Sequence, residues 1–394
     1  MNQYQSLRLK PGKERSLQRL HPWVFSGALA MDIKQIPEGE LVNITDINGA
    51  FIATGYVQHG SIAVRVLAFE KTSIDTDFWI RTLEKSFALR RMLGLTGNPL
   101  TNCYRLVHGE GDGVPGLIID IYAGTAVIQC HTSGIYLHLP AICEALKHVL
   151  GQGLKAVYDK SSETLHGAVP GASNGLIYGQ ADENVVSENG MKFRVDWETG
   201  QKTGFFLDQR DNRQLLGQYS KGKTVLNTFA YTGGFSVYAL MNGARQVDSV
   251  DVSKNAIQLL NENMALNDAS ATNHRGEAAD TFTFFKHTDQ TYDIVILDPP
   301  AFAKSVNARH NALMGYKRLA AEGLKKVGKG GLLFTFSCSQ VVDSHTFNQT
   351  MLAAAIETGR PAKILHRLTQ PADHPVNIFH PEGEYLKGLV LYVE

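Results

Sequence analysis

Cysteine pairs, long apolar runs and an excess of charge of either sign are all missing from this sequence of 394 residues. The four cysteines, Cys103, Cys130, Cys143 and Cys338, include no Cys-x-x-Cys pair, so the signature of a zinc ribbon or a thioredoxin-type site is absent. Four scattered cysteines in a long chain also do not resemble a disulfide scaffold. No stretch of 18 or more uncharged apolar residues occurs, and the N-terminal residues lack the apolar run of a signal peptide. We therefore predict a cytoplasmic protein without a metal site or a membrane-spanning helix.

The charges balance, with 38 Lys and Arg against 38 Asp and Glu. A protein without a global positive field can bind nucleic acid only through local basic patches. The N-terminal segment is one such patch: it includes Lys10, Arg15 and Arg19 and leads into the aromatic Trp23. Because basic segments beside aromatic side chains can hold RNA, we predict that these four residues contact RNA. The alternative is an ordinary solvated surface. Trp23 and Phe25 are also expected to anchor a small core.

The sequence pattern changes twice along the chain, and the length suits two or three domains. Residues 1–72 contain short β-type runs with a hairpin turn at Asn48-Gly49, which predicts a small, mostly β domain. Residues 73–182 combine amphipathic helices with strand-like runs and predict a central α/β domain. Residues 183–394 alternate apolar strands with helices, which favours a parallel, doubly wound, Rossmann-like sheet. The predicted fold class is therefore α/β.

Ligands of doubly wound sheets bind beyond the carboxyl ends of the strands. One predicted strand is followed by a turn containing Gly233 and Gly234, where the missing side chains would let a ligand approach the backbone. The turn is not Gly-x-Gly-x-x-Gly, so the dinucleotide fingerprint is not met. Asp251 follows the next strand, where a carboxylate can accept hydrogen bonds from two ribose hydroxyls, and Asp280 follows the third, near the place of an adenine amino group. Each acid alone is more often a cap or a surface residue, but together they indicate a nucleoside-bearing cofactor, and S-adenosylmethionine fits best.

Two further strands are expected to end beside each other with reactive side chains. Asp298-Pro299-Pro300 follows the first of them, and the two prolines hold a rigid, extended turn that presents carbonyl groups to a planar ligand. Cys338 ends the second. Neighbouring strands lie about 4.8 Å apart, so Asp298 and Cys338 could face one small pocket. The alternative for Cys338 is a small apolar filler.

This pair of side chains suits methylation of cytosine at C5. The C5 carbon is a poor nucleophile, but a thiolate that adds to C6 makes C5 electron-rich enough to attack an electrophilic methyl group. A carboxyl group at N3 would stabilise the charge that develops in the ring. A base must finally remove the C5 proton, and the sequence does not identify it.

Several motifs together resemble one known family. They are KTGFFLDQR at 202–210, NTFAYTGGF at 227–235, Asp298–Pro300 and Ser337–Ser339, with HPWVFSGA near the N-terminus and PEGEYLKG near the C-terminus. The combination spans nearly the whole chain and resembles the RlmI family of bacterial methyltransferases, which make 5-methylcytosine in 23S ribosomal RNA. One departure is Ala301, because members of that family often carry lysine after Asp-Pro-Pro.

The resemblance implies a PUA RNA-binding domain, a central α/β domain and a C-terminal class I methyltransferase domain that uses S-adenosylmethionine. It implies Cys338 as the nucleophile, Asp298 as the residue that holds cytosine, and Pro300 as a further contact of the substrate. It also implies a cofactor site formed by Phe206, Asp208, Gln209, Arg210, Asn227, Phe229, Tyr231, Thr232, Gly233, Gly234, Asp251, Asp280, Asp298 and Pro299.

Two other functions compete with this interpretation. Asp-Pro-Pro followed by an aromatic residue also resembles methyltransferases that act on a nitrogen lone pair, either guanine N7 or an exocyclic amine, and these need no thiol. The second alternative is a non-catalytic RNA-binding factor in ribosome assembly, which would tolerate loss of the glycine turn or of Cys338. A homodimer is also compatible with the sequence.

Overall fold

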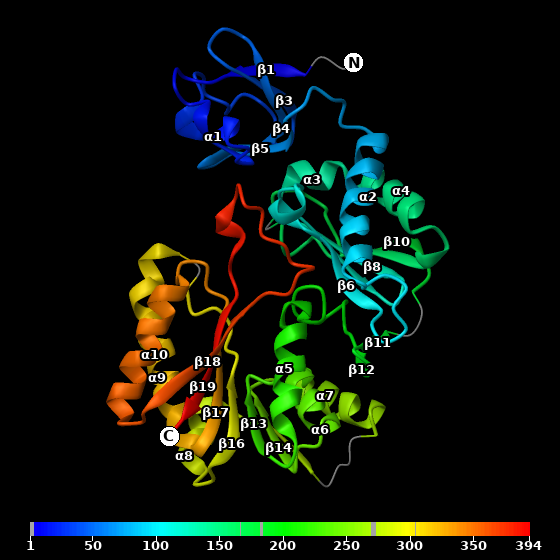
Figure 1. Ribbon diagram of the computed structural model, residues 1–394. Helices are drawn as coiled ribbons and strands as arrows, with labels where there is room; N and C mark the ends of the chain where they lie inside the picture. The colour runs from blue at the N-terminus through cyan, green and yellow to red at the C-terminus, as the bar shows by residue number, and fades with distance from the viewer. Residues whose placement is uncertain (1–3, 166, 182–183, 269–272, 304) are drawn as a thin grey trace. The chain divides into compact units, whose positions relative to one another are not determined.

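The chain, seen here in a computed structural model, forms two compact units (Figure 1). The structure describes residues 4–394 apart from 166, 182–183, 269–272 and 304. The first unit comprises Met1–Val186, Val195–Phe205 and Ala372–Gly383, and the second comprises Ser187–Arg194, Phe206–Pro371 and Glu384–Glu394. Both predicted N-terminal ranges, 1–72 and 73–182, thus lie in the first unit. The boundary predicted between residues 182 and 183 falls outside the described residues.

A small sheet at the N-terminus has the strand order β1-β3-β4-β5-β2. Its elements are β1 (Gln5–Arg8), α1 (Arg15–Gln18), β2 (Trp23–Phe25), β3 (Leu41–Thr45), β4 (Phe51–Val57) and β5 (Ile62–Ala68). The hairpin predicted at Asn48-Gly49 joins β3 to β4, and Gly49 has a φ of +89°. The Asp46 carboxylate accepts the N–H groups of Asn48 and Ala50, so the turn is held by its own sequence.

The prediction that Trp23 and Phe25 anchor the small core is wrong, as strand β2 shows. Phe25 is 47% exposed and Trp23 is half-buried, whereas Val24 between them is 2% exposed. Because successive side chains of a strand point to opposite faces, this three-residue strand buries only its middle side chain. Trp23 instead donates its indole N–H to Glu110 at 2.8 Å and lies beneath the guanidinium group of Arg65.

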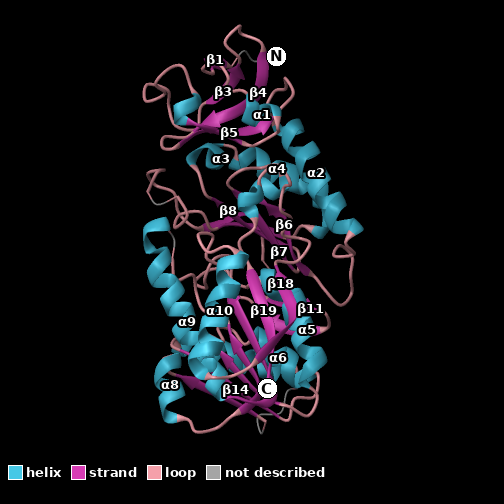
Figure 2. Cartoon of the chain, turned by 60° about the vertical axis from the view of Figure 1, so that its left-hand side comes forward, coloured by secondary structure: helices cyan, strands magenta, loops and turns pink. Residues whose placement is uncertain are grey.

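The central sheet of the first unit has the order β10-β9-β8-β7-β6 and is covered by helices (Figure 2). Its elements are α2 (Thr76–Met92), β6 (Cys103–His108), β7 (Leu117–Tyr122), β8 (Thr125–Cys130), α3 (Ser133–Leu137), α4 (Leu139–Leu150), β9 (Ala156–Asp159) and β10 (Gly175–Gly179). The Asp75 side chain caps α2 by accepting the N–H of Phe78. Trp79 and Leu83 of α2 and Leu146 of α4 share one buried core with the strands.

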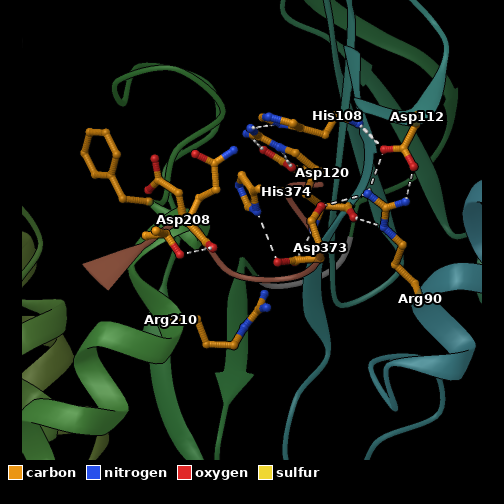
Figure 3. Close-up of polar contacts among 12 residues, drawn as sticks. Arg90, His108, Asp112, Asp120, Asp208, Arg210, Asp373 and His374 are labelled. Atoms are coloured by element: carbon orange, nitrogen blue, oxygen red, sulfur yellow. Dashed lines mark hydrogen bonds and ion pairs between the residues drawn. The ribbon is translucent and has the colours of Figure 1, made fainter. Parts of the chain in front are cut away.

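The buried Arg90 ties a distant segment to this sheet. Its guanidinium group forms an ion pair with Asp112 and donates to the carbonyl of Asp373 at 2.7 Å (Figure 3). The Asp373 carboxylate in turn accepts the N–H of Arg105 at 3.0 Å. These contacts explain why the segment Ala372–Gly383, far along the chain, belongs to the first unit.

The second unit is built on a seven-stranded sheet of order β15-β14-β13-β16-β17-β19-β18. Its strands are β13 (Thr224–Thr228), β14 (Gln246–Asp251), β15 (His274–Ala278), β16 (Tyr292–Leu297), β17 (Val327–Ser337), β18 (Ala362–Thr369) and β19 (Lys387–Val393), and a hairpin of β11 (Val185–Glu188) and β12 (Met191–Arg194) precedes them. Strands β13 to β17 are parallel, as predicted. Strand β19 is antiparallel to both its neighbours, so the sheet is mixed at this edge. The residues between β18 and β19 contain no α-helix, and a parallel return needs a long crossover connection.

Helices cover both faces of this sheet (Figure 1). They are α5 (Arg210–Ser220), α6 (Gly234–Met241), α7 (Lys254–Leu266), α8 (Thr281–His287), α9 (Arg309–Lys326) and α10 (Ser344–Thr358). Helices α5 and α6 pack on one core, and α8, α9 and α10 pack on the other. Ser253 caps α7 by accepting the N–H of Ala256.

Short 3-10 helices complete the described elements: η1 (Ser26–Ala28), η2 (Gly109–Asp112), η3 (Gly151–Gly153), η4 (Leu207–Gln209), η5 (Val306–Ala308) and η6 (Pro381–Gly383). Over the described part of the chain, every helix is too short or too polar to cross a membrane.

Candidate active site

The turn between β13 and α6 has a strained backbone. Phe229, Tyr231 and Gly233 have φ values of +56°, +47° and +81°, a region that costs a non-glycine residue roughly 1–2 kcal/mol. Three hydrogen bonds hold this conformation. Ala230 N–H donates to the Val250 carbonyl, Tyr231 N–H donates to the Asp251 carboxylate, and the Asn263 amide donates to the Thr232 carbonyl, at 2.8–3.0 Å. Backbone strain that is held in this way is common where a ligand binds.

Both glycines of the turn are needed for its packing. A side chain at Gly233 would bring its Cβ within 2.6 Å of Leu260 Cγ, and one at Gly234 would bring it within 3.0 Å of Arg213 Cδ. The sequence predicted that these glycines let a ligand approach. The structure adds that they let α7 and α5 approach the turn from behind.

The two acids predicted at the strand ends have different surroundings. Asp251 is half-buried, and its carboxylate accepts the N–H groups of Tyr231 and Ser253 at 2.9 Å each. A carboxylate has about four acceptor positions, so Asp251 can shape the turn and still accept ribose hydroxyls. Asp280 is exposed and caps α8 by accepting both the N–H and the hydroxyl of Thr283 through Oδ1. The cap role that the sequence left open for these acids is thus present at Asp280.

The predicted segment 206–210 lies between the turn and Asp298. The Phe206 ring lies edge-on to the ring of Tyr231, with 5.1 Å between centroids. Gln209 donates its side-chain amide to Asp298 Oδ2 at 3.0 Å, and Asp208 accepts the hydroxyl of Tyr385 at 2.7 Å. The structure therefore brings most of the predicted cofactor residues around one end of the sheet. Asn227 is buried within β13 and donates to Ser236 at 2.8 Å.

A buried ion cluster that the sequence did not predict supports this segment. Glu188 accepts two hydrogen bonds from Arg213, at 2.9 and 2.8 Å, and lies 3.5 Å from Arg210. These three side chains are at most 5% exposed. Arg213 also donates to the carbonyl of Phe206 at 2.8 Å. Burial, with the Glu188 charge, raises the pKa of the adjoining Tyr238. The cluster thus fixes α5 and the start of the cofactor segment.

Asp298 and Cys338 follow adjacent parallel strands, as predicted. Leu297 of β16 is paired with Thr335 of β17, so Asp298 is level with Phe336 and Cys338 follows two residues later. Strand spacings put the Cα atoms of Asp298 and Cys338 about 8 Å apart. Pro299 is buried and Pro300 is exposed.

Cys338 differs from the other cysteines of the chain. It is partly exposed, whereas Cys103, Cys130 and Cys143 are buried. Burial raises the pKa of Cys143, and that of Cys130 rises much further for the same reason. A nucleophilic cysteine needs a thiol that is exposed to its substrate and that ionises readily to the thiolate. Of the four, Cys338 is the one whose surroundings suit a nucleophile.

Sequence reasoning missed Lys387, which stands opposite the end of β17. It is paired with Ser337 across β17 and β19 and is 6% exposed. Its ammonium group donates to the carbonyls of Ser339 and Val342, at 2.7 and 2.6 Å. Burial lowers the pKa of Lys387 to about 8, while a negative charge on Cys338 acts in the opposite direction. The signals in the sequence were its place in the motif PEGEYLKG and at the head of the apolar run KGLVLYV.

The predicted RNA contacts lie at the surface of the first unit. Lys10, Arg15 and Arg19 are exposed, and Leu17 between them anchors α1 in the small core. Lys10 donates to the carbonyl of Gly27 at 3.2 Å. The Trp23 indole is engaged by its neighbours, so its stacking on RNA stays a prediction.

One group of metal-type ligands occurs in the described residues, formed by His21, His380 and Glu382. The Nε2 atoms of the two histidines lie 3.7 and 3.8 Å from the Glu382 carboxylate. His21 Nδ1 accepts the N–H of Trp23 at 3.2 Å, which places the proton of a neutral ring on Nε2. That tautomer favours a loose histidine–carboxylate pair over a metal ligand.

Comparisons with known proteins show which families this chain resembles. A family of S-adenosylmethionine-dependent methyltransferases matches residues 105–378, and a PUA-like domain family matches residues 7–69. The chain is 40% identical to ribosomal RNA large subunit methyltransferase I of Tolumonas auensis, covering 97% of this chain and 98% of that protein. It is 39% identical to the protein of the same name from Alteromonas mediterranea, with 98% of each covered.

Solved structures agree with these relatives. A methyltransferase crystallised with SAH has a TM-score of 0.86 at 26% identity, covering 99% of this chain and all of that one. A SAM-dependent methyltransferase from Streptococcus mutans has a TM-score of 0.85 at the same identity. The resemblance read from the motifs is confirmed: the chain belongs to the ribosomal RNA large subunit methyltransferase I family and is an S-adenosylmethionine-dependent methyltransferase with a PUA-like domain.

Proposed function

We propose that this enzyme methylates C5 of a cytosine in 23S ribosomal RNA through a covalent bond between Cys338 and C6 of the base. The observation that carries the proposal is the partly exposed thiol of Cys338, which directly follows β17, while Asp298 directly follows the adjacent strand β16. The names of the relatives support large-subunit ribosomal RNA as the substrate. A methyl acceptor with a nitrogen lone pair would need no thiol at this place.

The residues of the turn fit S-adenosylmethionine. The glycine turn has no room for a side chain behind it, Asp251 retains acceptor positions for ribose hydroxyls, and no phosphate cradle is required. Tyr231 and Phe206 would border the ligand from the same side. When bound, the cofactor supplies an electrophilic methyl group. Asp280, whose Oδ1 caps α8, is proposed to contact the adenine through its remaining oxygen.

The chain's own residues would act in sequence on the base. The Cys338 thiolate forms a bond to C6, and the π electrons of the C5–C6 bond move to C5. Asp298 donates a proton or a hydrogen bond at N3 and so stabilises the charge in the ring. After C5 has gained its methyl group, a base removes the C5 proton, the C5–C6 double bond forms again, and the Cys338–C6 bond breaks to return the thiolate. Gln209, which donates to Asp298, would orient that carboxyl group.

We further propose that the exposed basic residues Lys10, Arg15 and Arg19 of the PUA-like domain contact the RNA backbone. The target base must leave its stack to reach Cys338. Pro300, which is exposed two residues after Asp298, would border the extruded base. The enzyme would work in the cytoplasm, where ribosomal RNA is available.

The test is methyl transfer from labelled S-adenosylmethionine to 23S RNA transcribed in vitro, followed by nucleoside analysis. Wild type and Cys143→Ala should form 5-methylcytidine, because Cys143 is a buried cysteine of α4. Cys338→Ala should form none while it still binds the cofactor in calorimetry. A product derived from guanine or adenine, or continued 5-methylcytidine formation by Cys338→Ala, would overturn the proposal.

A further inference from the structure

We propose that Lys387 is the positioning residue of the Cys338 nucleophile: its ammonium group holds the chain beyond the thiol and favours the thiolate. This inference rests on the proposed function, which makes Cys338 a nucleophile. Nothing in the resemblance or in the relatives' names assigns a role to this lysine.

The geometry gives Lys387 a direct hold on the end of β17. Strands β17 and β19 are antiparallel neighbours over seven paired positions, and Ser337 and Lys387 form the last of these pairs. Cys338 is the first residue after β17. The Lys387 ammonium group reaches past it and binds the carbonyls of Ser339 and Val342. The turn that carries the thiol is therefore closed by a single buried cation.

Other contacts keep this turn in place from its far side. The hydroxyls of Tyr316 and Ser339 are hydrogen-bonded at 2.9 Å, and the Ser339 N–H donates to the Ser337 hydroxyl at 3.3 Å. The turn therefore has hydrogen bonds from uncharged groups in addition to those that it accepts from Lys387. A buried ammonium group is costly unless its charge is used.

The charge of Lys387 acts on Cys338. The charged or titratable groups that act on Lys387 are Cys338, Glu384 and Asp343, and each of them, when negative, favours the protonated lysine. The interaction is reciprocal, so a protonated Lys387 favours the Cys338 thiolate. A positive charge near a thiol favours the thiolate, because the attraction between opposite charges stabilises the ionised form.

The experiment is alkylation of Cys338 by iodoacetamide as a function of pH, without cofactor or RNA, followed by peptide mass spectrometry. The thiolate is the reactive form, so the pH at the midpoint of the rate profile is the pH at which half of the Cys338 thiol is ionised. Lys387→Met keeps the length of the side chain without its charge, and Lys387→Arg keeps the charge. We expect the rate at pH 7 to fall about tenfold in Lys387→Met and to stay within about twofold of wild type in Lys387→Arg.

An unchanged midpoint in Lys387→Met would overturn the inference, because a purely structural lysine would not move it. If Lys387→Met does not fold, the wild-type profile decides: a midpoint at or above about 8.5, the ordinary value for cysteine, overturns the inference. The proposed function fails separately. If the midpoint shifts in Lys387→Met but the wild type forms no 5-methylcytidine, the effect of Lys387 on the thiol stands and only the proposed reaction is overturned.

Discussion

The burial of Lys387 predicts how the stability of the protein changes with pH, and this prediction does not depend on catalysis. Its pKa in the folded protein is about 8, compared with its usual value of 10.5 in water, and burial is the main cause. As the pH rises, the folded protein releases this proton before the unfolded chain does. Between about pH 8 and 10.5 the unfolded chain therefore binds more protons, and the free energy of unfolding should rise with pH through this group.

The size of the effect follows from the two pKa values. The full difference corresponds to about 3.4 kcal/mol. Between pH 7 and pH 9.5 the contribution of Lys387 should grow by about 2 kcal/mol. Lys387→Met has no proton to release and should lack this increase. Loss of the hydrogen bonds to Ser339 and Val342 costs Lys387→Met about 2–6 kcal/mol at both pH values, so that loss cancels when the change with pH is compared.

The assay is urea unfolding of wild type and Lys387→Met at pH 7 and pH 9.5, followed by circular dichroism. Tyrosines and other lysines that titrate in this range contribute equally to both proteins and cancel as well. Cys338→Ala in both proteins removes the thiol that interacts with Lys387. The difference in unfolding free energy, wild type minus variant, should grow by about 2 kcal/mol at the higher pH. A difference that stays constant between the two pH values would refute the reasoning that burial disfavours the protonated form of Lys387.

Three further substitutions test the scaffold of the site. Glu188→Gln should lower the free energy of unfolding by about 3–5 kcal/mol, because it leaves buried arginines without their counter-charge; Glu262→Gln, in an exposed ion pair, should cost below about 1 kcal/mol in the same urea titration. Gly233→Ala should weaken cofactor binding at least about tenfold in calorimetry, since it adds a 2.6 Å clash to an unfavourable φ; Gly243→Ala, which has a similar φ and no close neighbour, should leave binding unchanged. Asp251→Asn should reduce cofactor affinity about 10- to 100-fold, because charged acceptors contribute about 1.5–3 kcal/mol, and equal affinity would contradict its dual role.

The sequence predicted the parts of the site that follow directly from local pattern. Apolar runs such as Tyr292–Leu297 are strands that are buried on both faces, and Asp298 comes at the end of one of them. The order of strands and helices then placed Cys338 directly after a neighbouring strand. The Asn48-Gly49 turn is similarly local, because it depends on the conformations open to a few adjacent residues.

Features that depend on distant pairing could not be predicted in this way. Lys387 gains its position from the antiparallel strand β19. Its direction follows from the connection between β18 and β19, which contains no α-helix for a parallel crossover. Glu188 and Arg213 meet only because a hairpin and a helix pack together. The error at Phe25 has a similar origin, since the strand β2 that turns this side chain outward is only three residues long and forms by pairing with β5.

The central claim is that Cys338 forms a covalent bond with cytosine, and trapping that bond tests it most directly. RNA that carries 5-fluorocytidine cannot lose a proton from C5, so the enzyme should stay attached to it after methyl transfer. With cofactor present, wild type and Cys143→Ala should give a protein–RNA band that survives denaturing electrophoresis, and Cys338→Ala should give none. An enzyme that forms 5-methylcytidine on ordinary RNA but yields no such band, or a band that persists in Cys338→Ala, would contradict the account.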